Sequence, residues 1–160
     1  MIGEVIGAVR ASQTATELLD DAVARYLGIH RTDYRCLDIL DQEGPMTAGR
    51  LAERARLSPG ATTTVIDRLE RKGLARRTRD AADRRRVLVE VDPSLRRQAA
   101  RLYGSPEDAL SAFDAYTDEQ LELLVDFLRG SVAFQEQVMH RLEALQAAEV
   151  ENAPSAPTDG

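Results

Sequence analysis

The sequence predicts a mainly helical protein that carries one small β-hairpin. Apolar residues repeat at three- and four-residue spacing over most of the chain, and this period changes to alternation in one central segment. The length limits the number of domains, because 160 residues suffice for one compact domain with helical appendages and are too few for a two-domain enzyme. The expected fold is therefore one helical domain with a hairpin inserted near its middle.

Two helices are expected in the first quarter of the chain. From Glu17 onward, apolar residues recur with helical spacing until Gly28, where the first helix should end. Thr32 is a suitable N-cap for a second helix, and the breaker Gly44-Pro45 should close it.

A short third helix and a fourth helix follow. Thr47 should cap the third helix. Ser58-Pro59 combines a capping residue with proline at the first helical position, where its missing N–H costs nothing. The fourth helix should then continue to Lys72 and stop at Gly73.

The alternating segment predicts a β-hairpin. Residues 74–79 and 85–91 have the pattern of two strands, and residues 80–83 form a polar turn between them. The hairpin is rich in arginine, with six of these residues in an eleven-residue stretch. They are Arg76, Arg77, Arg79, Arg84, Arg85 and Arg86.

Helices resume after the hairpin. Asp92-Pro93 should start one, residues 104–106 should interrupt it, and Thr117 with Gln120 forms a capping box for a long last helix. This helix carries an apolar stripe too long for a small monomer to cover, and the residues from Ala147 onward have the composition of a disordered tail. The stripe consists of Leu121, Leu124, Val125, Leu128, Val132, Met139, Leu142 and Leu145.

Charge is distributed unevenly along the chain. The net charge of −6 divides into −4 for residues 1–46, +7 for residues 47–97 and −9 for residues 98–160. A basic centre between acidic ends is compatible with a polyanionic partner at the centre, because phosphate binding depends on lysine and arginine. Of the 21 basic residues 20 are arginine, a bias that genomic nucleotide composition also explains.

Several classes of protein are disfavoured. The apolar runs are too short to cross a bilayer and the N-terminus lacks a basic start, so a soluble cytoplasmic protein without a membrane partner is expected. The single cysteine, Cys36, cannot form an internal disulfide. His30 and His140 have no metal-ligand spacing with it, and no glycine-rich phosphate loop is present. We therefore expect no enzyme, metal or cofactor.

The order of elements describes a winged helix-turn-helix. Residues 5–148 resemble the MarR family of bacterial transcription regulators through short stretches that occur in the family's order, including Leu57-Ser58, Gly73-Leu74 and the wing pattern of residues 83–89. The resemblance implies an N-terminal dimerisation helix at 1–30, a DNA-binding lobe at 31–92 and C-terminal dimerisation helices at 93–148. The disordered tail expected from composition then occupies residues 149–160.

The fourth helix is the expected reading element. Thr62, Val65, Ile66 and Leu69 fall at core spacing, which turns the other face outward. Threonine offers a hydroxyl for base edges and a methyl for the thymine methyl, so Thr63 and Thr64 are the base-reading candidates. The alternative is that they are only solvated helix residues. The expected DNA contacts of this helix are Pro59, Gly60, Thr63, Thr64, Arg68 and Arg71, the two arginines at phosphates.

The wing supplies the remaining expected contacts. By the family resemblance Arg85 is the wing-tip arginine that enters a minor groove, and Asp83 orients the turn. Arg84 and Arg86 are expected at phosphates or at the wing base, and Arg77 is a further expected DNA contact. The alternative is an ordinary solvated hairpin.

The resemblance also implies a homodimer and a small aromatic or anionic effector. The effector would lie between the dimerisation helices and the DNA-binding lobe, where Tyr26, His30, Arg31 and Tyr34 are candidate lining residues. The alternative is that the tyrosines are core or rim residues. Cys36 lies among apolar residues, so we expect a buried, inert thiol, not a peroxide sensor.

These observations predict a homodimeric, ligand-responsive transcription regulator, with repression favoured because occluding a promoter requires only DNA binding. The operator would be pseudo-palindromic, since a two-fold dimer reads two half-sites. The alternative function is a winged-helix module for protein interaction or non-specific DNA architecture, without ligand response.

Overall fold

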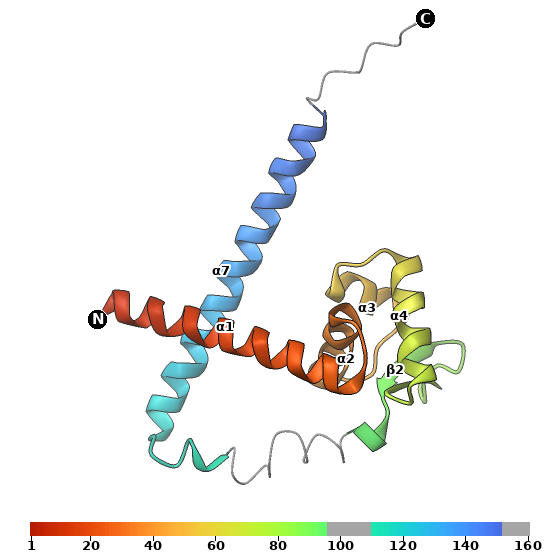
Figure 1. Ribbon diagram of the computed structural model, residues 1–160, viewed down its shortest axis with the longest axis horizontal. Coiled ribbons are helices and arrows are strands. Elements are labelled where there is room, and N and C mark those ends of the chain that lie inside the picture. The colour runs from red at the N-terminus through yellow and green to blue at the C-terminus, as the bar shows by residue number, and fades with distance from the viewer. Residues whose placement is uncertain (96–109, 152–160) are drawn as a thin grey trace, which may run out of the picture. The chain divides into compact units, whose positions relative to one another are not determined.

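The computed structural model describes residues 1–95 and 110–151. Four helices lead into a two-stranded hairpin, and one long helix, α7, lies near the C-terminus (Figure 1). The chain divides into two compact units, Met1–Pro106 and Glu107–Gly160. The mainly helical fold with one hairpin is confirmed. The expected break at residues 104–106 lies outside the described residues.

Helix α1 spans Ile2–Leu27 and ends as predicted at Gly28, which adopts the left-handed conformation with φ of 63°. Its start differs from the prediction, because the helix begins well before Glu17. The upstream residues include Gly3 and Gly7, which weaken helical propensity without breaking a helix. The helix therefore continues back to the N-terminus.

Helix α2 spans Arg31–Glu43 and its N-cap is His30, not Thr32 as predicted. His30 has extended backbone angles and makes no side-chain capping bond. The first turn instead contains Asp33, whose negative charge suits the positive end of a helix dipole. Gly44, with φ of 81°, ends the helix as expected.

The third and fourth helices begin at the predicted caps. Helix α3 spans Ala48–Ala55, and the hydroxyl of Thr47 accepts a hydrogen bond from the backbone N–H of Arg50. Helix α4 spans Pro59–Arg71 and is capped in the same way by Ser58. These polar caps fix the helix-turn-helix boundaries because they satisfy N–H groups that the helix leaves unpaired.

The wing consists of strands β1 (Ala75–Arg79) and β2 (Val87–Val91), which pair antiparallel with Ala75 opposite Val91. The loop before α3 joins this sheet through Met46, which exchanges both backbone hydrogen bonds with Val89 at 3.1 and 2.7 Å. The wing is thus attached at its base to the helix-turn-helix.

One apolar core holds the helices and the wing together. It draws on every element from α2 to β2, and the end of α1 packs against it through Leu27 and the following Ile29. The core residues are Cys36, Leu37, Leu40, Met46, Leu51, Ala55, Val65, Ile66, Leu69, Leu74, Ala75, Val89 and Val91.

Helix α7 spans Asp118–Glu151 and opens with the predicted capping box. Gln120 accepts a hydrogen bond from the Thr117 N–H at 2.9 Å, and the Thr117 hydroxyl accepts one from the Gln120 N–H at 3.3 Å. The helix continues past Ala147, where the disordered tail was expected to begin. Residues 152–160 lie outside the described part of the chain.

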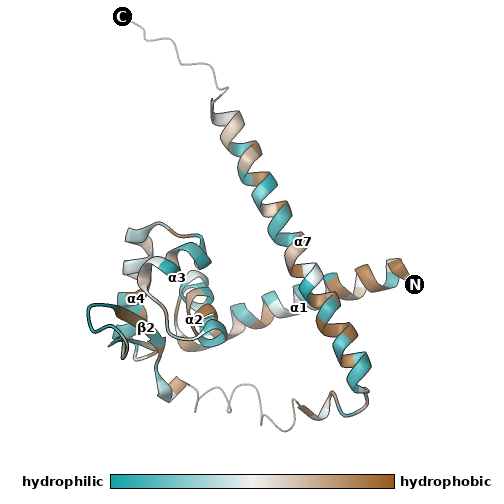
Figure 2. Cartoon of the chain, turned by 180° about the vertical axis from the view of Figure 1, so that it is seen from behind, coloured by the Kyte–Doolittle hydropathy of each residue, from teal (hydrophilic) through white to brown (hydrophobic). Residues whose placement is uncertain are grey.

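Apolar side chains are exposed along α7, whose ribbon alternates hydrophobic and hydrophilic stretches (Figure 2). Within the described residues no helix has the length and apolar character needed to cross a bilayer. The exposed members of the predicted stripe are Leu124, Val125, Leu128, Val132, Met139, Leu142 and Leu145.

Candidate nucleic-acid interface

Helix α4 has one buried and one exposed face, as its sequence predicts. Thr62, Val65, Ile66 and Leu69 are buried. The opposite side of the first turns is exposed and includes Pro59, Gly60, Thr63 and Thr64. The N-terminal half of α4 therefore offers a surface of small residues to a groove.

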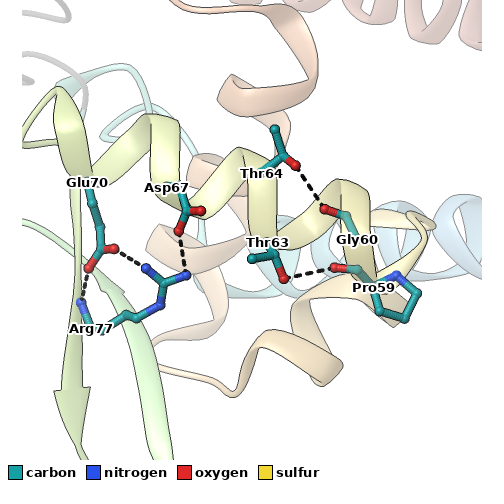
Figure 3. A network of polar contacts seen from close by, with 7 residues as sticks. All are labelled: Pro59, Gly60, Thr63, Thr64, Asp67, Glu70 and Arg77. Atoms are coloured by element: carbon teal, nitrogen blue, oxygen red, sulfur yellow. Dashed lines mark hydrogen bonds and ion pairs between the residues drawn. The ribbon is translucent and has the colours of Figure 1, made fainter.

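The threonine hydroxyls on this surface are hydrogen-bonded to their own helix (Figure 3). Thr63 donates to the carbonyl of Pro59 and Thr64 donates to the carbonyl of Gly60, each at 3.0 Å. Such bonds hold the side-chain rotamer, because the hydroxyl must point back along the helix. The two side chains are fixed before any partner arrives.

Arg68, an expected phosphate contact, is bound to a carboxylate in the free chain. Its guanidinium donates to both carboxylate oxygens of Asp33 on α2, with Nε to Oδ2 at 2.9 Å. Asp33 is only 1% exposed, and its hydrogen bond raises the pKa of Arg68. A buried carboxylate requires such a partner, so Arg68 joins α4 to α2.

Arg71 is exposed at the end of α4, on the outward face where it was predicted. The next residue, Lys72, has its ammonium group 3.5 Å from the carbonyl oxygen of Leu27. A shallow cavity of about 230 Å³ lies beside them, lined also by His30 and Gly28.

Arg77, an expected DNA contact, connects the wing to α4 in the free chain (Figure 3). Its Nη2 lies 2.8 Å from Oδ1 of Asp67, its Nη1 donates to Glu70, and its backbone N–H donates to Glu70 at 2.9 Å. The hydrogen bond to Asp67 raises the pKa of Arg77. Two carboxylates of α4 thus hold the first wing strand.

The wing tip, residues 80–86, is shaped by two aspartates. Asp83 accepts a hydrogen bond from the N–H of Arg85 at 3.0 Å, and Asp80 accepts one from Ala82 at 2.9 Å. Bonds of this kind define tight turns, and the first gives Asp83 the geometry expected of a turn-orienting residue. Arg84, Arg85 and Arg86 are all exposed, and the guanidinium of Arg86 is 3.8 Å from Asp80.

The four candidate effector residues do not line one cavity. Arg31 and Tyr34 border a depression of about 250 Å³ between α1 and α2, together with Asp20 and Asp38. His30 lines the separate cavity beside α4. Tyr26 is 70% exposed on α1 and borders neither of these cavities. The four residues are close in sequence but do not form one site, because Tyr26 points outward from α1 and His30 lies in a different cavity from Arg31 and Tyr34.

Cys36 is fully buried among the core residues. Burial raises the pKa of its thiol to about 11. This agrees with the predicted inert thiol, because the thiolate is the reactive form.

Sequence reasoning missed three carboxylates that position this surface. Asp67 and Glu70 had a recognisable signal, because they lie three residues apart on a helix that precedes an arginine-rich strand. Asp33 had none, since its partner Arg68 is 35 residues away in the chain.

Comparison with known proteins supports one family. Residues 29–87 match the family model of the MarR family. The uncharacterized HTH-type transcriptional regulator YcgE of Bacillus subtilis (strain 168) is 36% identical over 131 residues, which cover 81% of this chain and 85% of YcgE. The chain belongs to the MarR family of transcriptional regulators. MarR-family proteins are DNA-binding regulators and not enzymes, as the sequence predicted.

Solved structures agree with the MarR fold. The transcriptional regulator Tm0710 of Thermotoga maritima superposes with a TM-score of 0.56 at 20% identity, covering 85% of this chain and 96% of Tm0710. NadR in complex with 4-hydroxyphenylacetate gives a TM-score of 0.54 at 21% identity, covering 78% of this chain and 89% of NadR.

Proposed function

We propose that this protein is a cytoplasmic, homodimeric repressor that binds a pseudo-palindromic operator and releases it on binding a small aromatic or anionic effector. The observation that carries the proposal is the pairing of a fixed, exposed threonine surface on α4 with an exposed arginine tip on the attached wing. Small polar groups suit a major groove and guanidinium groups suit an adjacent minor groove.

A footprint on the intergenic DNA upstream of the protein's own gene tests operator binding. We expect a protected site with two related half-sites about one helical turn apart. The alternative function, a non-specific architectural or protein-interaction module, predicts either uniform protection or none. Either of those results would contradict the proposal.

Dimerisation is supported by exposed apolar surface at both ends of the chain. On α1 this includes Ile2, Val5 and Ile6, and on α7 it includes the predicted stripe. Apolar patches of this kind on a regulator's helices favour association with a second copy. We assign 1–30 and 93–148 to dimerisation and 31–92 to DNA binding.

Sedimentation of wild type and two matched variants tests the dimer. Leu128→Lys changes the middle of the α7 stripe and should give a monomer at micromolar concentration. Gln137→Lys introduces the same charge at an exposed polar residue on the opposite face of α7, so it should remain dimeric. A monomeric wild type would refute the homodimer.

The effector site is proposed at the depression between α1 and α2. Its lining holds the ring of Tyr34 with Arg31 and Arg35 beside Asp20 and Asp38. Because Arg31 is already paired with Asp21 at 3.1 Å, we expect Arg35 to bind the carboxylate of an aromatic acid. Because NadR has been solved with 4-hydroxyphenylacetate, that compound is the first probe. It should weaken operator binding by the wild type and by the exposed control Arg10→Gln, and have less effect on Arg35→Gln. Equal effects on both variants would exclude this depression.

A further inference from the structure

The exposed surface of the first turns of α4, residues 59–67, offers hydrogen-bond acceptors and no free side-chain donor, and the exposed Arg71 lies beyond it at the end of the helix. A hydroxyl has a single hydrogen, and those of Thr63 and Thr64 are already donated to carbonyls of their own helix. Each oxygen can therefore only accept a hydrogen bond from a partner, while each methyl remains for apolar contact.

Asp67 extends this surface by one further acceptor. It lies four residues after Thr63 and three after Thr64, so the three side chains are neighbours on the helix. Its carboxylate is 52% exposed and bonds to Arg77 at 2.8 Å. This bond offsets the negative charge, so that a carboxylate can approach DNA.

Guanidinium donors are missing from this part of the helix. Residues 59–67 contain neither lysine nor arginine. The two arginines that lie next to it, Arg68 and Arg77, have their guanidinium groups bound to carboxylates. The contact by which proteins most often read guanine, a bidentate arginine or lysine on O6 and N7, therefore has no source at the first two turns of α4.

We propose that Thr63, Thr64 and Asp67 make α4 a reader of exocyclic amino groups, namely adenine N6 and cytosine N4, and of thymine methyl groups. This inference rests on the proposed operator binding through α4. An A·T pair presents an amino donor and a methyl group together in the major groove, so it can donate a hydrogen bond to the threonine hydroxyl oxygen and contact the threonine methyl. Guanine O6 and N7 are acceptors and would face the acceptors of α4 without a hydrogen between them.

The experiment uses the full-length protein and duplexes selected by it from a random pool. In the selected half-sites, single adenines are replaced by purine, which lacks the N6 amino group, and single thymines by deoxyuridine, which lacks the methyl. Single guanines are replaced by 7-deazaguanine, which lacks N7. We expect at least one purine position and one deoxyuridine position to weaken binding about three- to tenfold, with no such loss from 7-deazaguanine.

Two variants at one position separate the hydroxyl from the methyl. Thr64→Val removes the hydroxyl and keeps the methyl, so it should bind the purine-substituted and normal duplexes equally while remaining sensitive to deoxyuridine. Thr64→Ser removes the methyl and should show the opposite pattern. Each loss is the ratio of affinities for the normal and the substituted duplex with the same variant, so a change in overall affinity does not imitate either pattern.

Asp67→Asn provides an independent change, because an amide can donate as well as accept. This variant should tolerate guanine where the wild type rejects it. A loss at 7-deazaguanine that Thr64→Val or Asp67→Asn removes would overturn the inference while leaving operator binding intact. Binding without sequence preference in the selection would refute the proposed function and, with it, this inference.

Discussion

The arginines around α4 and the arginines of the wing tip have opposite surroundings. Arg68 and Arg77 are bound to carboxylates that come from α2 and α4. Arg84 and Arg85 are exposed on the turn, where Asp83 binds a backbone N–H. One group therefore holds elements together, and the other presents charge to solvent.

This difference suggests a division of labour between structure and affinity. An arginine that neutralises a buried carboxylate contributes to stability and has no vacant charge for a phosphate. An exposed arginine contributes little to stability and much to the salt dependence of DNA binding. Sequence alone placed both kinds in one group, because all of them lie in the basic centre of the chain.

The largest expected effect is on stability. Arg68→Ala leaves Asp33 buried without its partner, so the free energy of unfolding should fall by about 3 kcal/mol. Urea denaturation measures the change. The control Arg71→Ala removes an exposed arginine of the same helix and should change stability by less than about 0.5 kcal/mol. Equal losses in both variants would contradict the comparison.

The reactivity of Cys36 tests whether the core beneath α2, the helix that carries Asp33, stays inaccessible to solvent. Because burial raises the pKa of this thiol to about 11, from 9.0, alkylation at pH 8 should be about 100-fold slower than for an ordinary thiol. The same shift stabilises the fold below pH 9, and that contribution should disappear as the pH rises towards 11. A Cys36→Ser variant should lack this pH dependence, and rapid alkylation of the native protein would disprove the prediction.

A change at the wing tip should affect DNA binding and leave stability unchanged. Arg85→Ala should weaken operator binding about tenfold, reduce the slope of log affinity against log salt by about one, and leave unfolding unchanged. Titrations at several salt concentrations measure the slope. An unchanged slope would mean that Arg85 does not reach DNA charge.

Arg77 provides the smallest and most discriminating test. Arg77→Met removes ion pairs that are partly exposed, so stability should fall by about 1 kcal/mol. The salt slope should not change, because the wild-type guanidinium is bound to Asp67 and Glu70. If the slope fell by about one, as for Arg85→Ala, Arg77 would be shown to contact DNA charge.

Much of the fold followed from local signals. The caps at Thr47 and Ser58 and the stop at Gly28 were predictable because each acts on backbone groups within a few residues. The start of α1 was not, since its first residues lack a cap and contain glycines. The start of α2 was not predictable from a cap either, because its N-cap His30 makes no side-chain capping bond and the suitable cap Thr32 lies inside the helix.

The sequence by itself determined the order of elements, the buried face of α4 and the basic centre, because periodicity, caps and charge are properties of short stretches. Only the tertiary structure decided which arginines are bound to carboxylates. Asp33 meets Arg68 across 35 residues, and Arg77 meets Asp67 and Glu70 across the short turn between α4 and β1. The Asp33–Arg68 pair depends on where the core places α2 and α4, and no local pattern records that.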